Sequence, residues 1–231
     1  MKYLLLIFAL FTTAASATDC PQHYLDGMQP ATQISRELCY SEFAVGYSDD
    51  KRSAIYVVEH ITKDELIAAD ALVRKDKFHE ELRIPSPARA LLSDYKSSGF
   101  DRGHLAPNAD MPTTLAQYES FSLANMVPQL HHNNAGVWLT IERAVRSAAM
   151  SYGDVYAVTG AIYSETPPLL KDRIPVPGAL FKAVYVPATS TATVYVSDNG
   201  FLGTYHTISV ADLQLLTGFN VFPSLPAAQN D

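Results

Sequence analysis

The sequence predicts an α+β fold with a central antiparallel sheet and flanking helices. Two runs rich in β-branched residues, at 55–61 and 155–162, predict strands. One long amphipathic segment, residues 134–152, predicts a helix. Because strands and helices are mixed along the chain without a regular βαβ alternation, an antiparallel sheet is favoured over a parallel one.

Local signals define the elements between residues 55 and 92. The strand IYVVEHI at 55–61 is followed by Thr62 and Glu65, which resemble a capping box that opens a short helix through residue 71. The segment IPSP at 84–87 interrupts regular structure because it contains two prolines. A brief helix is expected at 88–92.

The helix predicted at 134–152 has two distinct sides. Its apolar stripe consists of Val137, Ile141, Val145 and Ala148, and the opposite side carries Arg143, Arg146 and Ser147. Asn134 lies at the start on the stripe side, and Glu142 lies at the margin of the stripe. Both side chains can therefore line one inward-facing edge of the helix, which Gly153 ends.

The last third of the chain adds strands and one more helix. The apolar run at 155–162 predicts a buried strand, and the segments 181–186 and 193–197 predict a hairpin. Ser209 is placed to cap a final helix at 210–216, which Gly218 ends.

The length and composition are those of one folded domain that follows a leader. The 231 residues are 48% hydrophobic and 18% charged. Residues 1–17 have a positive start, an apolar run and the cleavage pattern Ala15-Ser16-Ala17, which predicts a secretory signal peptide. The alternative is a membrane anchor, for which the apolar run is too short. We expect a domain at 18–231, secreted or periplasmic, with no membrane contact after cleavage.

Two cysteines, Cys20 and Cys39, remain in the mature chain. In an exported protein such a pair usually forms a disulfide. Closing a loop of this size would contribute about 3 kcal/mol to the free energy of unfolding. The alternative is two unlinked buried thiols.

The net charge is unfavourable for an extended nucleic-acid surface. It is −7 for the whole chain, and removal of residues 1–17 deletes only Lys2, which leaves −8. Proteins that bind nucleic acids are more often basic. The acidic total therefore predicts weak non-specific binding outside a local positive cleft.

The most informative motif is Asp101-Arg102-Gly103-His104. An imidazole can take a proton from water near neutral pH, and a guanidinium can hold phosphate oxygens. A histidine and an arginine at this spacing therefore suit the hydrolysis of a phosphate ester.

The motif and several further segments resemble the DNA/RNA non-specific endonucleases, the ββα-metal family with the signature DRGH. The further segments are Arg74-x-x-x-Phe78, SLANMVPQ at 122–129, NNAGVWLTIE at 133–142 and LTG at 216–218. The likeness spans roughly residues 36–222 in the expected order. Asn108 and the pair His131-His132 depart from the family pattern, and we expect both histidines at the surface or rim of the site.

The resemblance implies a ββα-metal active site and assigns roles to its residues. His104 is expected to be the general base, Asn134 the sole direct protein ligand of a divalent cation, and Glu142 the acceptor of hydrogen bonds from metal-bound water. Asn134 could instead be an N-cap, with Asn133 as the alternative cap and a one-residue shift as the alternative register.

Other residues are expected to support these three. Arg74 and Arg102 are candidates for phosphate contact and stabilisation of transition-state charge. Asp101 is expected to orient the loop or pair with an arginine, and Asn125 to brace the site through hydrogen bonds. Trp138 is expected to anchor the helix in the core.

The implied function is a sugar-non-specific endonuclease that hydrolyses DNA and RNA and leaves 5′-phosphate ends. Mg²⁺ is the expected cofactor, with Mn²⁺ or another divalent cation as alternatives. A phosphodiesterase for small nucleotides and a non-catalytic secreted binding protein on a nuclease scaffold stay open as alternatives. Preference for DNA or RNA, oligomeric state and biological role stay open as well.

Overall fold

The computed structural model describes residues 18–201 and 203–226. The predicted signal peptide, residues 1–17, lies outside the described residues. In the described part, none of the helices combines the length and apolarity needed to cross a membrane.

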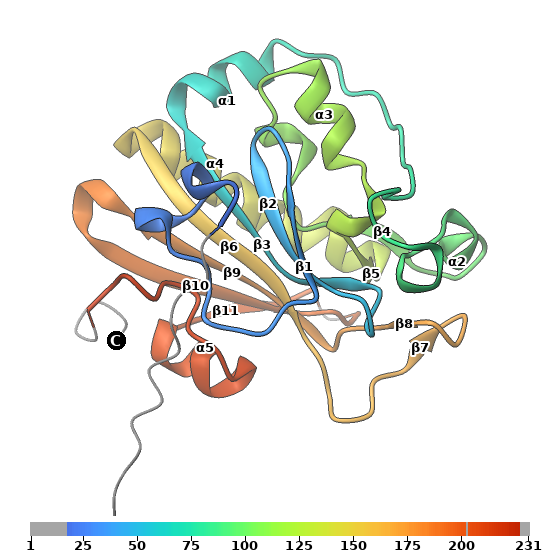
Figure 1. Ribbon diagram of the computed structural model, residues 1–231. Helices are drawn as coiled ribbons and strands as arrows, with labels where there is room; N and C mark the ends of the chain where they lie inside the picture. The colour runs from blue at the N-terminus through green and yellow to red at the C-terminus, as the bar shows by residue number, and fades with distance from the viewer. Residues whose placement is uncertain (1–17, 202, 227–231) are drawn as a thin grey trace, which may run out of the picture.

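A seven-stranded sheet forms the centre of the molecule (Figure 1), and every neighbouring pair of its strands is antiparallel. The order β1-β2-β3-β6-β9-β10-β11 comprises β1 Arg36–Cys39, β2 Phe43–Ser48, β3 Ser53–Thr62, β6 Asp154–Ile162, β9 Ala179–Val186, β10 Thr191–Asp198 and β11 Tyr205–Ile208. This confirms the predicted α+β class with a central antiparallel sheet. The strands expected at 55–61 and 155–162 are β3 and β6, and the expected hairpin is β9–β10.

Most of the helices begin and end where local signals predict. In α1, Lys63–Asp70, the capping box is present: the Glu65 N–H donates to Thr62 Oγ1, and the Thr62 N–H donates to Glu65 Oε2 at 2.9 Å. Ser209 caps α5, Val210–Thr217, and Gly218 ends it with φ of 81°. The short α3, Thr114–Ser120, has no counterpart in the sequence-based expectations.

The helix expected at 88–92 is misplaced. The structure has a 3₁₀ turn at Ser86–Ala88 and α2 at Leu92–Tyr95, with extended backbone at Arg89 and Leu91 between them. Asp94 Oδ2 accepts a hydrogen bond from the Leu91 N–H at 2.8 Å, so the helix begins after that residue.

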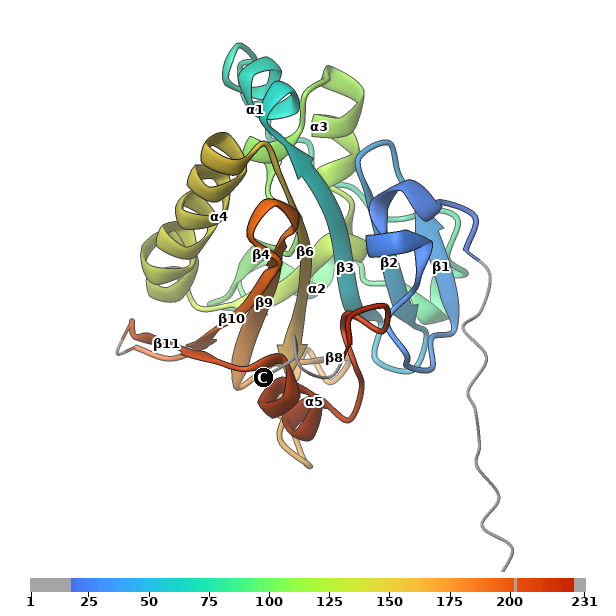
Figure 2. The same ribbon diagram turned by 90° about the vertical axis from the view of Figure 1, so that its left-hand side faces the viewer.

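The long helix starts with a π turn, Asn133–Trp138, and continues as α4, Leu139–Tyr152. Figure 2 shows α4 lying along the face of β6 and β9. Of the predicted stripe, Val137, Ile141 and Val145 are buried. The fourth buried position is Ala149 and not Ala148, which is half-buried.

The two faces of the sheet carry separate cores. On one face Trp138 and Ile141 pack with Val45, Val57 and other apolar residues around β4 and β5. On the other face α5 and the N-terminal segment pack against β9 and β10. The strands β4, Asp101–His104, and β5, Met126–Gln129, form their own antiparallel pair, in which His104 is opposite Met126. A further short pair is β7, Leu169–Leu170, with β8, Ile174–Pro175.

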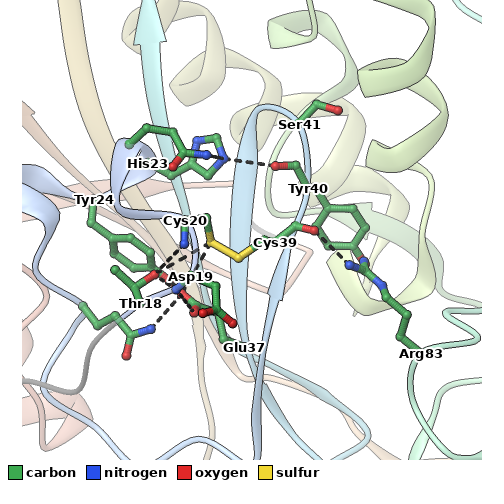
Figure 3. Close-up of a disulfide and its surroundings, with 12 residues drawn as sticks. Thr18, Asp19, Cys20, His23, Tyr24, Glu37, Cys39, Tyr40, Ser41 and Arg83 are labelled. Carbon is green, nitrogen blue, oxygen red and sulfur yellow. Dashed lines mark hydrogen bonds between the residues drawn. A yellow bond between two sulfur atoms is a disulfide. The ribbon is translucent and has the colours of Figure 1, made fainter.

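A disulfide joins Cys20 to Cys39 with a Cα–Cα distance of 5.9 Å, as predicted (Figure 3). The neighbouring Glu37 carboxylate accepts hydrogen bonds from Thr18 Oγ1 at 2.6 Å and Tyr24 OH at 2.6 Å. These contacts hold the N-terminal segment against the edge strand β1.

Candidate active site

All five of the predicted site residues meet in one cleft of about 550 Å³. Strand β4 contributes Arg102 and His104, the long helix contributes Asn134 and Glu142, and the loop after α1 contributes Arg74. Residues separated by as many as 68 positions in the chain therefore surround a single space. The β4–β5 pair and the long helix together form the predicted ββα motif.

His104 lies at the end of β4 in an aromatic setting. Its ring centroid is 5.0 Å from that of Phe121 and 5.7 Å from that of Phe78. The indole N–H of Trp138 donates to the His104 carbonyl at 3.3 Å, so Trp138 anchors the helix in the core, as predicted, and also fixes the end of β4. The imidazole Nε2 is enclosed and has no hydrogen-bond partner among the residues that the structure describes.

Burial lowers the pKa of His104 to about 3. The positive charge of Arg74 acts in the same direction, Asp76 opposes it, and Arg102 lowers the pKa further. The imidazole is therefore neutral at physiological pH and has a free lone pair.

Gly103 is required by close packing of the two strands. A Cβ atom at this position would lie 2.1 Å from Gln129 Oε1 and 2.7 Å from Gln129 Cβ. Gln129 is fully buried, and its amide donates to Asn133 Oδ1. Gly103 thus leaves room for the Gln129 side chain of β5, which forms a hydrogen bond with Asn133 of the long helix.

The amide of Asn134 is oriented by Asp101. Asn134 Nδ2 donates to Asp101 Oδ2 at 2.9 Å, and His131 Nδ1 lies 2.8 Å from the same oxygen. Because the amide nitrogen is held by the carboxylate, the amide oxygen is left for the cleft. Of the two roles expected for Asp101, pairing with an arginine is not found: its partners are Asn134 and His131.

Asn133 points in another direction and does not line the cleft. It is fully buried, and its Nδ2 donates to Ser197 Oγ at 2.5 Å and to the Asp198 carbonyl at 2.7 Å. Neither asparagine caps the helix, because the Asn134 N–H already donates to the Leu130 carbonyl at 2.9 Å. The N-cap alternative is therefore wrong for both residues.

The π turn brings Asn134 and Glu142 into phase. Eight residues of an ideal α-helix leave two side chains about 80° apart, because each turn holds about 3.6 residues. A π turn takes up one extra residue, which reduces this offset to about 20°. Both side chains consequently project into the cleft.

Glu142 is 9% exposed and lies near two buried charged residues, Lys182 and Asp110. Burial raises the pKa of Glu142 to about 7; Lys182 opposes this shift, and Asp110 adds to it. Lys182 Nζ donates to Thr159 Oγ1 at 2.6 Å and to the Leu105 carbonyl at 3.2 Å, and lies 3.5 Å from Glu59 Oε2.

Sequence reasoning missed this group of buried charges. Glu59 and Lys182 each stand in an apolar strand, β3 and β9, and each is 1% exposed. Arg146, which the helical wheel placed on the outer side, forms an ion pair with buried Asp110 at 2.9 Å. A charged residue within a run of buried strand residues was the available signal.

The two arginines of the cleft wall each lie over an aromatic ring. Arg74 pairs with Asp76 at 2.7 Å and lies over the ring of Phe121. Arg102 lies 4.1 Å from the ring centroid of Phe78 and has no carboxylate partner in the described ranges. Stacking fixes the plane of this guanidinium while its N–H groups stay available for an anion.

The hydrogen bonds expected of Asn125 are present. Its Oδ1 accepts from the Ala106 N–H at 2.9 Å, and its Nδ2 donates to the carbonyls of Ala106 and Ser120. They fix the turn that follows His104. His131 and His132 are exposed, as expected.

The donor set in the cleft fits a hard divalent cation. Asn134 offers a neutral amide oxygen whose amide nitrogen is already bound, and Glu142 offers a carboxylate that no other described residue uses as a hydrogen-bond acceptor. Mg²⁺ prefers oxygen ligands and keeps several waters, so one or two protein oxygens suffice.

The known proteins that this chain resembles are nucleases. A sequence profile described as DNA/RNA non-specific endonuclease matches residues 25–228. The human protein "Nuclease EXOG, mitochondrial" is 32% identical over 213 residues, which cover 81% of this chain and 57% of that protein. "Nuclease C1" from Cunninghamella echinulata var. echinulata is 34% identical over 166 residues, which cover 66% of each. The chain thus spans a little more than half of the human protein.

A solved structure supports the fold. A chain in the crystal structure of the EndoG/EndoGI complex superposes with a TM-score of 0.77 and 24% identity, over 85% of this chain and 89% of that chain. The family profile covers most of the sequence. The chain therefore belongs to the DNA/RNA non-specific endonuclease family.

Proposed function

We propose that this protein is an endonuclease that hydrolyses phosphodiester bonds of DNA and RNA with a divalent cation, Mg²⁺ by preference. The observation that carries the proposal is the convergence of His104, Asn134, Glu142, Arg74 and Arg102 in one cleft. Family membership supplies the reaction class, and the cleft supplies a base, oxygen ligands and anion-binding groups.

His104 would act as the general base. Its Nε2 is enclosed, so the water to be activated would be bound through Nδ1. A neutral imidazole is competent to take a proton, but a pKa of about 3 makes it a weak base before substrate binds. A phosphate between Arg74 and Arg102 would offset their positive charges, so substrate binding would itself raise the basicity of His104.

Asn134 and Glu142 would hold the cation. The Asn134 amide oxygen would bind it directly, with Asp101 keeping the amide in the productive orientation. Glu142 would accept hydrogen bonds from water bound to the cation, and the positive charge would favour its ionised form. When bound, the cation supplies neutralisation of charge that develops on the phosphate and the leaving oxygen.

The two arginines would fix the scissile phosphate in line with the water at His104. Stacking on Phe78 holds Arg102 ready for two parallel N–H···O contacts. With the 3′-oxygen as the leaving group, the products carry 5′-phosphate ends.

We further propose that residues 18–231 act as a single secreted or periplasmic nuclease domain. The leader pattern at 1–17 and the Cys20–Cys39 disulfide support this, because disulfides persist in oxidising compartments.

The test is digestion of plasmid DNA and of RNA by the mature protein, with and without EDTA. The proposal requires chelator-sensitive internal cleavage of both polymers. Faster turnover of a dinucleotide than of plasmid would favour a phosphodiesterase for small nucleotides, and no cleavage with any divalent cation would indicate a binding protein.

A further inference from the structure

A second pocket adjoins the catalytic cleft. It has a volume of about 510 Å³ and shares Arg74, Asn108 and Ala109 with the cleft as a common wall. Its other walls come from α1, α3 and α4, which gather at the same end of the molecule in both Figure 1 and Figure 2. This size suits a ligand such as a nucleoside.

The lining of this pocket is mainly apolar, with one unpaired amide. Leu66, Ile67, Leu72 and Met150 contribute apolar side chains, although Ile67 is 54% exposed and Met150 is 40% exposed. Gln117 as a residue is 7% exposed, and its side-chain amide forms no hydrogen bond with another residue that the structure describes. Apolar walls with one free amide suit a flat heterocycle that also presents donors and acceptors at its edge.

The charges around the pocket favour a nucleobase over a phosphate group as its ligand. Asp70 lies in its wall and disfavours an anion there, and Arg146, which also lines the pocket, is already paired with Asp110 at 2.9 Å. Arg74 stands at the boundary with the cleft, and Gln117 separates the pocket from a smaller recess of about 190 Å³ that is lined by Lys75 and Lys77. Cationic groups thus stand on both sides of an apolar space, as the alternation of phosphate and base along a strand requires.

We propose that this pocket, here called the base pocket, binds one unpaired nucleobase of the substrate next to the scissile phosphodiester, with Lys75 and Lys77 holding the following phosphate. The inference rests on the proposed function, because it describes how the same cleft binds a nucleic-acid strand. It also explains how an acidic protein retains a polyanion: apolar contact with a base supplements a short cationic track.

The experiment is a scan of abasic positions in a single-stranded oligonucleotide with one cleavable linkage. In the wild-type protein, removal of the base at one position beside the linkage should raise KM about tenfold, which corresponds to the loss of about 1.4 kcal/mol of apolar contact. In Ile67→Glu, KM for the intact strand should rise by a similar factor, and the same abasic position should have no further effect.

Controls separate a lost pocket from a damaged enzyme. Ile67→Glu should hydrolyse bis(4-nitrophenyl) phosphate, which has no base, at the wild-type rate. Met150→Glu, on another wall of the pocket, should reproduce the result, whereas Leu215→Glu, a matched change at an 85% exposed position on α5, should not. Lys75→Ala with Lys77→Ala should make the log–log salt dependence shallower by about 0.7 for each lost contact.

An equal abasic penalty in the wild type and in both pocket variants, or no sensitive position in the wild type, would overturn the base pocket. A wild-type protein that cleaves neither plasmid nor oligonucleotide would instead overturn the proposed function. The two failures are therefore distinguishable.

Discussion

Two adjacent asparagines should give opposite results when each is changed to alanine. Asn133 is fully buried and forms three side-chain hydrogen bonds, to Gln129, Ser197 and the Asp198 carbonyl. Asn134 is half-buried, donates to Asp101 and lines the cleft. We expect Asn133→Ala to reduce stability and Asn134→Ala to reduce activity.

The magnitudes follow from the contacts. Each lost hydrogen bond costs about 1 kcal/mol, and each buried partner left unsatisfied costs about 1–3 kcal/mol. Asn133→Ala should therefore lower the free energy of unfolding by about 3–5 kcal/mol. For a domain of this size, that corresponds to a fall in Tm of roughly 6–20 °C. Asn134→Ala loses one contact with a half-exposed carboxylate and should cost about 1 kcal/mol.

The activity expected for the two variants is reversed. If Asn134 is the sole direct ligand, no other side chain replaces it, and the loss should exceed the roughly 100-fold limit typical of groups that act through water. Asn133→Ala, assayed well below its Tm, should stay within a few-fold of the wild type.

Urea and thermal unfolding measure the first quantity, and a Mg²⁺ titration of plasmid cleavage measures the second. The reasoning would be refuted if folded Asn133→Ala were inactive while Asn134→Ala stayed active, or if Asn134→Ala were the less stable variant. Either result would mean that the amide facing the cation has been misidentified.

Five further results are expected. His104→Ala should lower kcat by about 10²–10⁴-fold with an unchanged Mg²⁺ requirement, and activity within a few-fold of wild type would exclude it as the base. Glu142→Gln should lower activity by about 10–100-fold and recover in part at higher Mg²⁺, whereas a loss that no Mg²⁺ concentration relieves would indicate a direct role in catalysis. Because the pKa of His104 is lowered to about 3, the unfolded chain binds a proton first, so stability should fall as the pH drops from about 6.5 to about 3, a decline that is weaker in His104→Ala. Without Mg²⁺, the raised pKa of Glu142, about 7, gives the opposite sign: stability present below about pH 4.5 is lost as the pH rises to about 7, and Glu142→Gln should flatten this loss. Reduction of Cys20–Cys39 should lower the free energy of unfolding by about 3 kcal/mol, and two alkylatable thiols in the exported protein would contradict the bond.

Local sequence signals were reliable where the partner lies a few residues away. The capping box of Thr62 and Glu65, the cap at Ser209 and the glycine that ends α4 all close hydrogen bonds or turns within about one helical turn. The helix expected at 88–92 was misplaced although its signal is also local: Asp94 caps the backbone at Leu91, so the helix begins at Leu92.

The sequence alone also determined the composition of the site. The order and spacing of its motifs predict which family the chain joins and which residue types meet: a histidine base, two arginines, an amide and a carboxylate. The sequence could predict these residue types because they depend on residue identity and not on the orientation of the side chains.

Only the tertiary structure decided which asparagine faces the cleft. That choice depends on Ser197 and Asp198, which lie more than 60 positions away in the sequence and draw Asn133 toward β10, and on a π turn that a uniform helical wheel does not represent. The pairing of buried Lys182 with Glu59 could not be predicted from the sequence either, because it depends on the positions of β3 and β9 in the whole sheet. The sequence determines which residue types are present. The direction of each side chain and its pKa depend on residues distant in the sequence that only folding brings into contact.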